Sequence, residues 1–260
     1  MVDFIVIIPA RYASSRFPGK PLAEIAGKPM LAHVAERARK SGAREVLIAT
    51  DHPEIAAAAG RYGFTAVMTR RSHASGTDRL AEVVARRRYP ARQIVVNVQG
   101  DEPLIEPALI REVASNLARH RDAQIATVCT PIHDARDLAN PNIVKVVLDN
   151  DGYALYFSRA PVPHARDASA RSHDPSRRQP AIPRGLPVYR HLGLYAYHCG
   201  FLRRFTRLKP ALIERFEALE QLRALAHGFR ISVAITHKAP HPGIDTPQDL
   251  QRARRQFRRA

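Results

Sequence analysis

Short apolar runs alternate with helix-like patterns along the first half of the chain. The run at 4–8 is apolar throughout and that at 94–98 nearly so, which is typical of strands buried on both faces of a parallel sheet. The pattern predicts strands at 4–8, 46–49, 66–68 and 94–98, and helices at 30–40, after Pro53 and at about 78–88. Strands that alternate with helices form right-handed βαβ units, so we predict a doubly wound, mostly parallel α/β sheet.

The second half is less regular. Apolar runs at 144–149 and 153–157 flank the turn signal Asp151-Gly152 and predict a hairpin, whereas residues 164–190, rich in Arg, Ser and Pro, predict a surface loop. The pattern then predicts a strand at 192–197, helices at 198–207 and 213–227, a strand at 231–235 and a closing helix after Pro247. We expect a single α/β domain over residues 1–260, with a smaller lobe and a flexible loop near 150–200.

Composition narrows the class of protein. With 260 residues and 45% hydrophobic content, the chain can bury one large core. The longest apolar runs have the length of strands, so we expect no membrane span, and the start Met1-Val2-Asp3 predicts no targeting segment. Cys129 and Cys199 match no metal-ligand spacing and suit a reduced, cytoplasmic protein.

The net charge of +17 is compatible with a nucleic-acid binder, a site for anionic substrates or a solvated, arginine-rich surface. Arginines recur along the whole chain, with clusters at 86–88, 177–178 and 252–259. A solvated basic face explains this spread better than a polynucleotide groove, so we expect no nucleic-acid partner.

The loop that follows the first strand has the composition of a polyphosphate site. Between residues 9 and 22 it carries three cations and two hydroxyl groups: Arg11, Ser14, Ser15, Arg16 and Lys20. Ligands of open α/β sheets bind beyond the carboxyl ends of the strands, and amides, hydroxyls and cations together bind phosphates. The loop is neither a Walker P-loop nor a GxGxxG turn, which argues against ATPase and dinucleotide-binding functions.

Two acidic motifs are candidates for a cation site. Asp101 follows the most apolar strand, and Asp245 precedes the closing helix. Each acid alone has a structural explanation, because Asp101 can form a turn and either Asp245 or Thr246 can cap the helix, with Pro247 in its first turn. Mg²⁺ prefers few carboxylates together with substrate phosphates, so the two acids together would complete a magnesium site.

Five motifs occur together and in order with the opening loop: 69–79, 98–103, 153–159, 190–195 and 243–247. With them the chain closely resembles the 3-deoxy-manno-octulosonate (Kdo) cytidylyltransferases, also called CMP-Kdo synthetases, from about residue 4 to about residue 250. The resemblance weakens in the 164–190 loop and in the arginine-rich tail. It implies a nucleotide-diphospho-sugar transferase-like variant of the Rossmann fold with a smaller β-rich dimerisation lobe.

The resemblance also implies roles for individual residues. The CTP phosphates would be bound by Arg11, Ser14, Arg16 and Lys20, and the cytosine by Arg70, His73, Ser75 and Gly76. Gln99 would lie between nucleotide and sugar, and Asp101 and Asp245 would bind Mg²⁺; with Arg11 and Lys20 these two acids form the catalytic set. The sugar pocket would comprise Arg159, His191, Tyr195, Glu220 and Gln221, with Arg159 facing the Kdo carboxylate. For Glu220, a solvent-facing acid on a helix is an equal alternative.

The implied reaction is magnesium-dependent transfer of CMP from CTP to Kdo, for lipopolysaccharide biosynthesis, by a cytoplasmic homodimer. Two other sugar acids, sialic acid and 8-amino-Kdo, remain alternative substrates. The motifs favour Kdo over sialic acid but do not separate Kdo from its 8-amino analogue. A basic nucleic-acid-binding protein on the same scaffold would explain the charge, but it would not explain two acidic motifs at the site.

Overall fold

The computed structural model describes residues 2–13, 17–73, 75–166, 182–238 and 243–257. Its backbone contacts divide the chain into two compact units. Unit 1 comprises Met1–Arg121, Leu194–Arg207 and Pro240–Ala260, and unit 2 comprises Asp122–Gly193 and Leu208–Ala239. The single domain with a lobe near 150–200 stays a prediction, and most of the predicted 164–190 loop lies outside the described residues.

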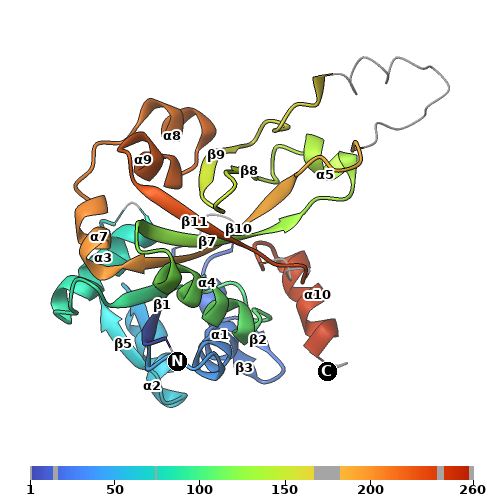
Figure 1. Cartoon of the computed structure of the whole chain (residues 1–260). Helices are drawn as coiled ribbons and strands as arrows, with labels where there is room; N and C mark the ends of the chain where they lie inside the picture. Colours follow the sequence, from blue (N-terminus) through green and yellow to red (C-terminus); the bar gives the residue numbers. More distant parts are fainter. Residues whose placement is uncertain (1, 14–16, 74, 167–181, 239–242, 258–260) are drawn as a thin grey trace. The chain divides into compact units, whose positions relative to one another are not determined.

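Unit 1 is built around a mostly parallel sheet in the order β5-β4-β1-β6-β10 (Figure 1). Its strands are β1 (Phe4–Ala10), β4 (Glu45–Thr50), β5 (Thr65–Met68), β6 (Ile94–Asn97) and the end of β10 (Tyr189–His198). Its helices are α1 (Met30–Lys40), α2 (Pro53–Arg61), α3 (Gly76–Arg86), α4 (Pro107–Arg119), α7 (Cys199–Phe205) and α10 (Pro247–Phe257). A short helix η1 (Lys20–Leu22) and the small hairpin of β2 (Glu24–Ile25) and β3 (Lys28–Pro29) follow the first strand.

The central strands of unit 1 are covered on both faces. In β1 every residue except Pro9 is buried, and β6 is buried along its whole length. α1 packs against α2 and α4, whereas α3 packs against α7. Parallel pairing of β1 with β4 and β6, and antiparallel pairing of β10 with β6, confirm the predicted α/β fold. None of the described helices is long and apolar enough to cross a membrane.

Unit 2 combines a parallel strand pair with the predicted hairpin. β7 (Ala123–Pro131) runs parallel to β11 (Arg230–Ile235), and β8 (Lys145–Leu148) pairs antiparallel with β9 (Ala154–Ser158). The start of β10 pairs with β8, so β10 contributes residues to both units. The described residues of unit 2 also form three short helices: α5 (Ala135–Ala139), α8 (Leu212–Glu217) and α9 (Gln221–Ala226).

The helix predicted over 213–227 is wrong in one respect, because the structure has two helices there. Ala218 adopts a left-handed backbone with φ 51°, and Leu219 donates its amide to Glu214 O at 3.2 Å. This closes α8 before α9 begins, as left-handed residues commonly do at helix ends. The sequence patterns also left α4, β7 and α5 unpredicted.

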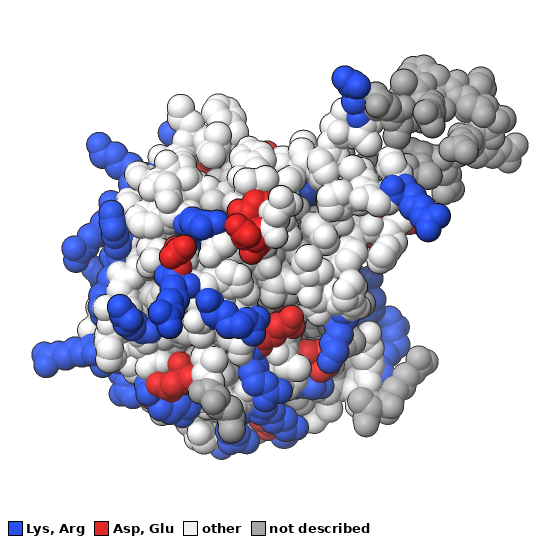
Figure 2. Space-filling model, viewed as in Figure 1, with Lys and Arg blue, Asp and Glu red and all other residues white. Residues whose placement is uncertain are grey.

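Positive charge is widely distributed on the face of the molecule that Figure 2 shows. Lys and Arg side chains lie at many places on this face, and the acidic side chains lie among them. Several are paired at the surface, such as Arg44 with Asp3 and Arg87 with Glu45. This distribution agrees with the predicted solvated basic surface.

Gly100 allows the loop after β6 to lie directly against the end of β1. A Cβ atom at this position would stand 2.9 Å from the carbonyl oxygen of Pro9 and 3.7 Å from the Ile8 side chain. The first contact is too short for a real Cβ and involves backbone, which cannot rotate away. The close approach of the two loops therefore requires glycine at this position.

We predict that Gly100→Ala lowers the free energy of unfolding by about 1–3 kcal/mol, because the backbone must shift to admit the methyl group. Gly60→Ala is the matched control: Gly60 lies in α2, and a Cβ atom added there would have no neighbour within 4 Å outside its own helix. That change should stabilise by about 0.4–1 kcal/mol. Urea unfolding of both variants measures the difference, and a Gly100→Ala protein as stable as the wild type would contradict the prediction.

Candidate active site

The opening loop of unit 1 is held by backbone hydrogen bonds and a ring stack. Gly19, with φ 69°, donates its amide to Tyr12 O at 2.9 Å. The Tyr12 ring stacks on His52 with 3.9 Å between centroids. This geometry leads the chain into η1, whose first residue is Lys20. Arg11 lies at the start of the loop, whereas the predicted phosphate ligands Ser14 and Arg16 lie outside the described residues.

Lys20 brings the two predicted acidic motifs together. Its Nζ lies 2.6 Å from Asp101 Oδ2 and 3.2 Å from Asp245 Oδ1. The Lys20 side chain is 13% exposed, so water screens these ion pairs only in part. The backbone supports the same approach, because Ile244 donates its amide to Asp101 O at 2.9 Å.

Thr246, rather than Asp245, caps the closing helix. Asp249 donates its amide to Thr246 Oγ1 at 3.2 Å, and the Asp249 carboxylate accepts the amides of Asp245 and Thr246. Hydrogen bonds from Thr246 and Arg252 lower the pKa of Asp249 to about 2. The capping task thus falls to Thr246 and Asp249, and the Asp245 carboxylate turns to Lys20.

The carboxylates of Asp101 and Asp245 fit a hard divalent cation. A lysine ammonium already lies between them, which shows that this place stabilises positive charge. Both donors are oxygens from separate loops, and Mg²⁺ is commonly held by one or two carboxylates plus substrate phosphates and water. Among the described residues, no group of three or more His, Cys, Asp and Glu side chains could hold a metal by itself. The donor set therefore suits a cation that arrives with a phosphate ligand.

Glu102 lies next to Asp101 and was not assigned a role from the sequence. Burial raises the pKa of Glu102 to about 8, and the negative charge of Asp101 adds to the effect. The Glu102 side chain therefore carries a proton through much of the neutral range. In the sequence, the only signal for this raised pKa is that Glu102 directly follows Asp101, because the burial of Glu102 cannot be read from the sequence.

The segment predicted to face cytosine is ordered by α3. Ser75 caps this helix reciprocally with Asp78: Asp78 N donates to Ser75 Oγ at 3.1 Å, and Ser75 N to Asp78 Oδ2 at 3.2 Å. Gly76 opens the helix, and its Cβ position is 3.6 Å from the Pro9 ring. Gln99 follows β6, and its carbonyl accepts the amide of Glu102 at 3.3 Å.

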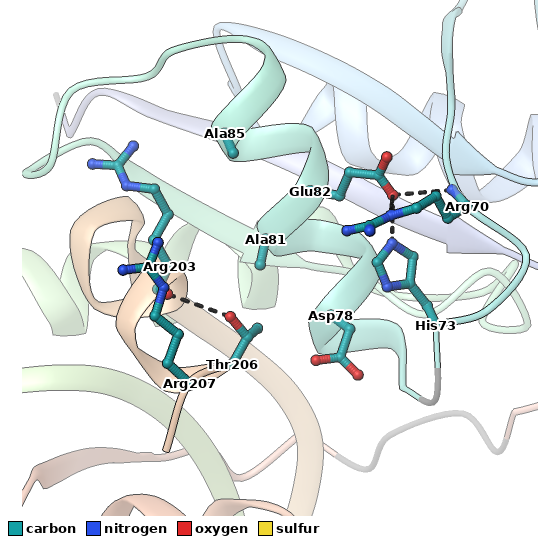
Figure 3. Close-up of a pocket in the computed structure, with 9 residues that line it drawn as sticks. All are labelled: Arg70, His73, Asp78, Ala81, Glu82, Ala85, Arg203, Thr206 and Arg207. Atoms are coloured by element: carbon teal, nitrogen blue, oxygen red, sulfur yellow. Dashed lines mark hydrogen bonds and ion pairs between the residues drawn. The ribbon is translucent and has the colours of Figure 1, made fainter. Parts of the chain in front are cut away.

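Arg70 and His73 surround the carboxylate of Glu82. Glu82 Oε2 accepts the Arg70 amide at 3.0 Å and is hydrogen-bonded to His73 Nε2. Burial raises the pKa of Glu82, but these two hydrogen bonds and the charge of Arg86 outweigh it, so the net pKa is lowered. Arg70 and His73 line a cavity of about 400 Å³ beside α3. Figure 3 shows them on one side of this cavity, with Arg203 and Arg207 on the other side.

Four predicted sugar-pocket residues lie in unit 2 and one in unit 1. Tyr195 of unit 1 is opposite Asn97 in the β10–β6 ladder. In unit 2, Glu220 precedes α9 with its carboxylate 4.0 Å from Arg223, and Gln221 is 8% exposed. The Gln221 Nε2 atom is buried without a hydrogen-bond partner in the described part of the chain.

Arg159 directly follows β9, and main-chain acceptors hold its guanidinium. Its Nε donates to Glu217 O at 2.7 Å and its Nη1 to Pro141 O at 3.0 Å. His191, on β10, has its Nε2 2.9 Å from Thr127 Oγ1. Burial lowers the pKa of His191 to about 3, so the imidazole is neutral at physiological pH.

Comparison with known proteins defines the class of enzyme. A family model described as cytidylyltransferase matches residues 5–231. The chain belongs to the cytidylyltransferase family, which makes it a nucleotidyltransferase.

Within this family, a solved CMP:2-keto-3-deoxy-manno-octonic acid synthetase complexed with CTP is 39% identical over 99% of each chain, with a TM-score of 0.87. This match confirms the resemblance predicted from the motifs. A cytidylyltransferase from Leptospira borgpetersenii serovar Hardjo-bovis is 15% identical, with a TM-score of 0.56, covering 96% of this chain and 83% of its own. That second likeness shows the fold alone.

The neutral, buried His191 predicts a pH-dependent stability. The unfolded chain takes up a proton at this histidine below about pH 6.5, whereas the folded chain does so only near the lowered pKa. Unfolding is therefore favoured as the pH falls, by up to about 1.4 kcal/mol per pH unit.

In urea titrations between pH 7 and pH 4.5, His191→Asn should lose stability less steeply than the wild type as the pH falls. His227→Asn, at an exposed histidine of the same unit, is the matched control and should follow the wild type. Parallel curves for His191→Asn and the wild type would show that this histidine does not contribute.

Proposed function

We propose that the chain transfers CMP from CTP to Kdo and releases pyrophosphate, a step of lipopolysaccharide biosynthesis. The observation that carries the proposal is the 39% identity over 99% of both chains to a synthetase of that sugar acid complexed with CTP. Support comes from unit 1, where a lysine and two carboxylates meet at the predicted polyphosphate loop.

In the proposed reaction the anomeric hydroxyl of Kdo attacks the α-phosphorus of CTP, the bond to the bridging oxygen breaks, and pyrophosphate leaves. Positioning and charge stabilisation supply most of the catalysis in such transfers. Arg11 and Lys20 would offset the charge that builds up on the departing pyrophosphate. Gly100 keeps the Asp101 loop against the end of β1, so these groups stay in reach of one another.

Asp101 and Asp245 would hold Mg²⁺. Bound there, the ion would lower the pKa of the attacking hydroxyl and neutralise charge on the α-phosphate. Lys20 keeps the two carboxylates side by side and would turn to the phosphates as they arrive, because its ammonium can pair with either anion.

We also propose a cytoplasmic homodimer, as the sequence resemblance implies. Two free, buried cysteines support a reducing compartment, and burial raises the pKa of both Cys129 and Cys199 to about 12. Thiols of this kind are inert packing groups rather than reactive sites.

Pyrophosphate release from CTP tests the function. With Mg²⁺ we expect release only when Kdo is added, and Asp101→Ala should lower the rate at least about 100-fold, because charge stabilisation at the reacting phosphate is lost. Asp122→Ala, at an acid whose side chain is 74% exposed, is the matched control and should keep the wild-type rate.

The other outcomes separate the alternatives. Release with sialic acid or 8-amino-Kdo, but not with Kdo, would keep the chemistry and replace the substrate. If no sugar acid supports pyrophosphate release, and the protein binds RNA with an affinity that falls steeply with salt, the proposed function is wrong and a nucleic-acid-binding function is favoured.

A further inference from the structure

Arg159 is an unusual arginine, because neutral groups hold its charged end. Both acceptors of its guanidinium are main-chain carbonyls, those of Glu217 and Pro141. No carboxylate forms an ion pair with this guanidinium in the described part of the chain, although the residue is only partly exposed. Its Nη2 amino group has no partner there. The ionised Glu217 carboxylate acts on this charge without forming an ion pair with the guanidinium. A half-buried guanidinium whose hydrogen bonds go to neutral acceptors is suited to bind an anion.

Glu217 holds the backbone of Arg159 as well as its side chain. Its Oε2 accepts the Arg159 amide at 2.8 Å, and its Oε1 accepts Ser158 Oγ at 2.6 Å. Tyr156 adds a longer hydrogen bond at 3.5 Å. Burial raises the pKa of Glu217, but the hydrogen bonds from Ser158 and Arg159 outweigh it and lower the net pKa, so the carboxylate stays ionised. One residue of α8 therefore fixes three polar positions at the end of β9.

Lys145 holds the main-chain carbonyl of Arg159. Its side chain is fully buried, and its ammonium donates to Arg159 O at 2.6 Å, Ile143 O at 2.7 Å and Asn140 O at 3.0 Å. A buried ammonium is costly unless its donors are satisfied, and here three carbonyls satisfy them. The amide, the carbonyl, Nε and one N–H of Nη1 of Arg159 thus have partners among the described residues. Both N–H groups of Nη2 and the second N–H of Nη1 are left for a ligand.

We propose that Glu217 is a positioning residue for the sugar acid: it fixes Arg159, with Lys145 as second anchor, so that Nη2 is presented to the substrate carboxylate. The inference rests on the proposed function, because it assigns Arg159 to the carboxylate of that substrate. Neither Glu217 nor Lys145 was a candidate from the sequence. Glu217 does not touch the substrate in this arrangement and acts only through Arg159.

Glu217→Gln tests the proposal in the whole enzyme. The glutamine side chain has one acceptor oxygen and no negative charge, whereas the two carboxylate oxygens of Glu217 accept from Ser158 Oγ and from the main-chain N–H of Arg159. One of these two hydrogen bonds is therefore lost in the variant, and Arg159 should be held less firmly. We expect KM for Kdo to rise about tenfold while KM for CTP changes less than about twofold, since only sugar binding uses Arg159. Ser158→Ala, which removes one of the two contacts, should shift the same constant less.

Asp149→Asn is the matched control. Asp149 is also a carboxylate that accepts backbone amides, from Asp151 at 3.0 Å and Tyr153 at 2.7 Å, but at the other end of the same β8–β9 hairpin. The Asp149→Asn variant should keep the wild-type KM values for Kdo and for CTP. If Asp149→Asn raised the KM for Kdo as much as Glu217→Gln does, loosening the β8–β9 hairpin would be enough to explain the effect. That result would overturn the specific positioning role of Glu217.

A double-mutant cycle separates positioning from general support. If Glu217 acts through Arg159, the variant that carries both Arg159→Ala and Glu217→Gln should have the KM for Kdo of Arg159→Ala alone. Additive effects would overturn the inference, and so would an unchanged KM for Kdo in a folded Glu217→Gln enzyme. Absence of turnover with any sugar acid in the wild type is a different result, because it overturns the proposed function itself.

Discussion

The ion pairs of Lys20 join three distant stretches of unit 1 into one site. Lys20 is 81 residues from Asp101 and 225 residues from Asp245 in sequence. Two carboxylates in contact with the same atom would repel each other without a positive charge between them. The loops after β1 and β6 and the turn before α10 therefore depend on one cation for their mutual arrangement, and the backbone bond between Ile244 and Asp101 reinforces it.

Much of this arrangement could be predicted from the sequence, because its causes are local. β1 is buried almost throughout and contains only apolar residues, and α1 runs from Met30 to Lys40 as its spacing predicts. The loops at the carboxyl ends of β1 and β6 could be named as the candidate site from topology alone. Pairing of Lys20 with both acids was not foreseen, but each member was a candidate.

The rest could not be predicted, because it depends on what surrounds a charged side chain after folding. Arg79 is fully buried and donates to Asp51 Oδ2 at 2.8 Å, yet in the sequence it looks like one more surface arginine. Lys145 lies in a short strand where either face could have been exposed. Ala218 breaks a helix whose apolar spacing continues on both sides, and no glycine marks the break. Such features follow from tertiary packing and leave no local signal.

The proposed role of Arg159 in binding the substrate carboxylate has a consequence for which sugars would be accepted. Arg159 and Lys145 carry two positive charges and Glu217 one negative charge, so this part of unit 2 keeps a surplus of one. A carboxylate would balance that surplus, whereas a neutral aldose would displace water from the partly exposed guanidinium and leave its charge unmatched. Neutral hexoses of similar size would thus be rejected by charge, even where their shape fits.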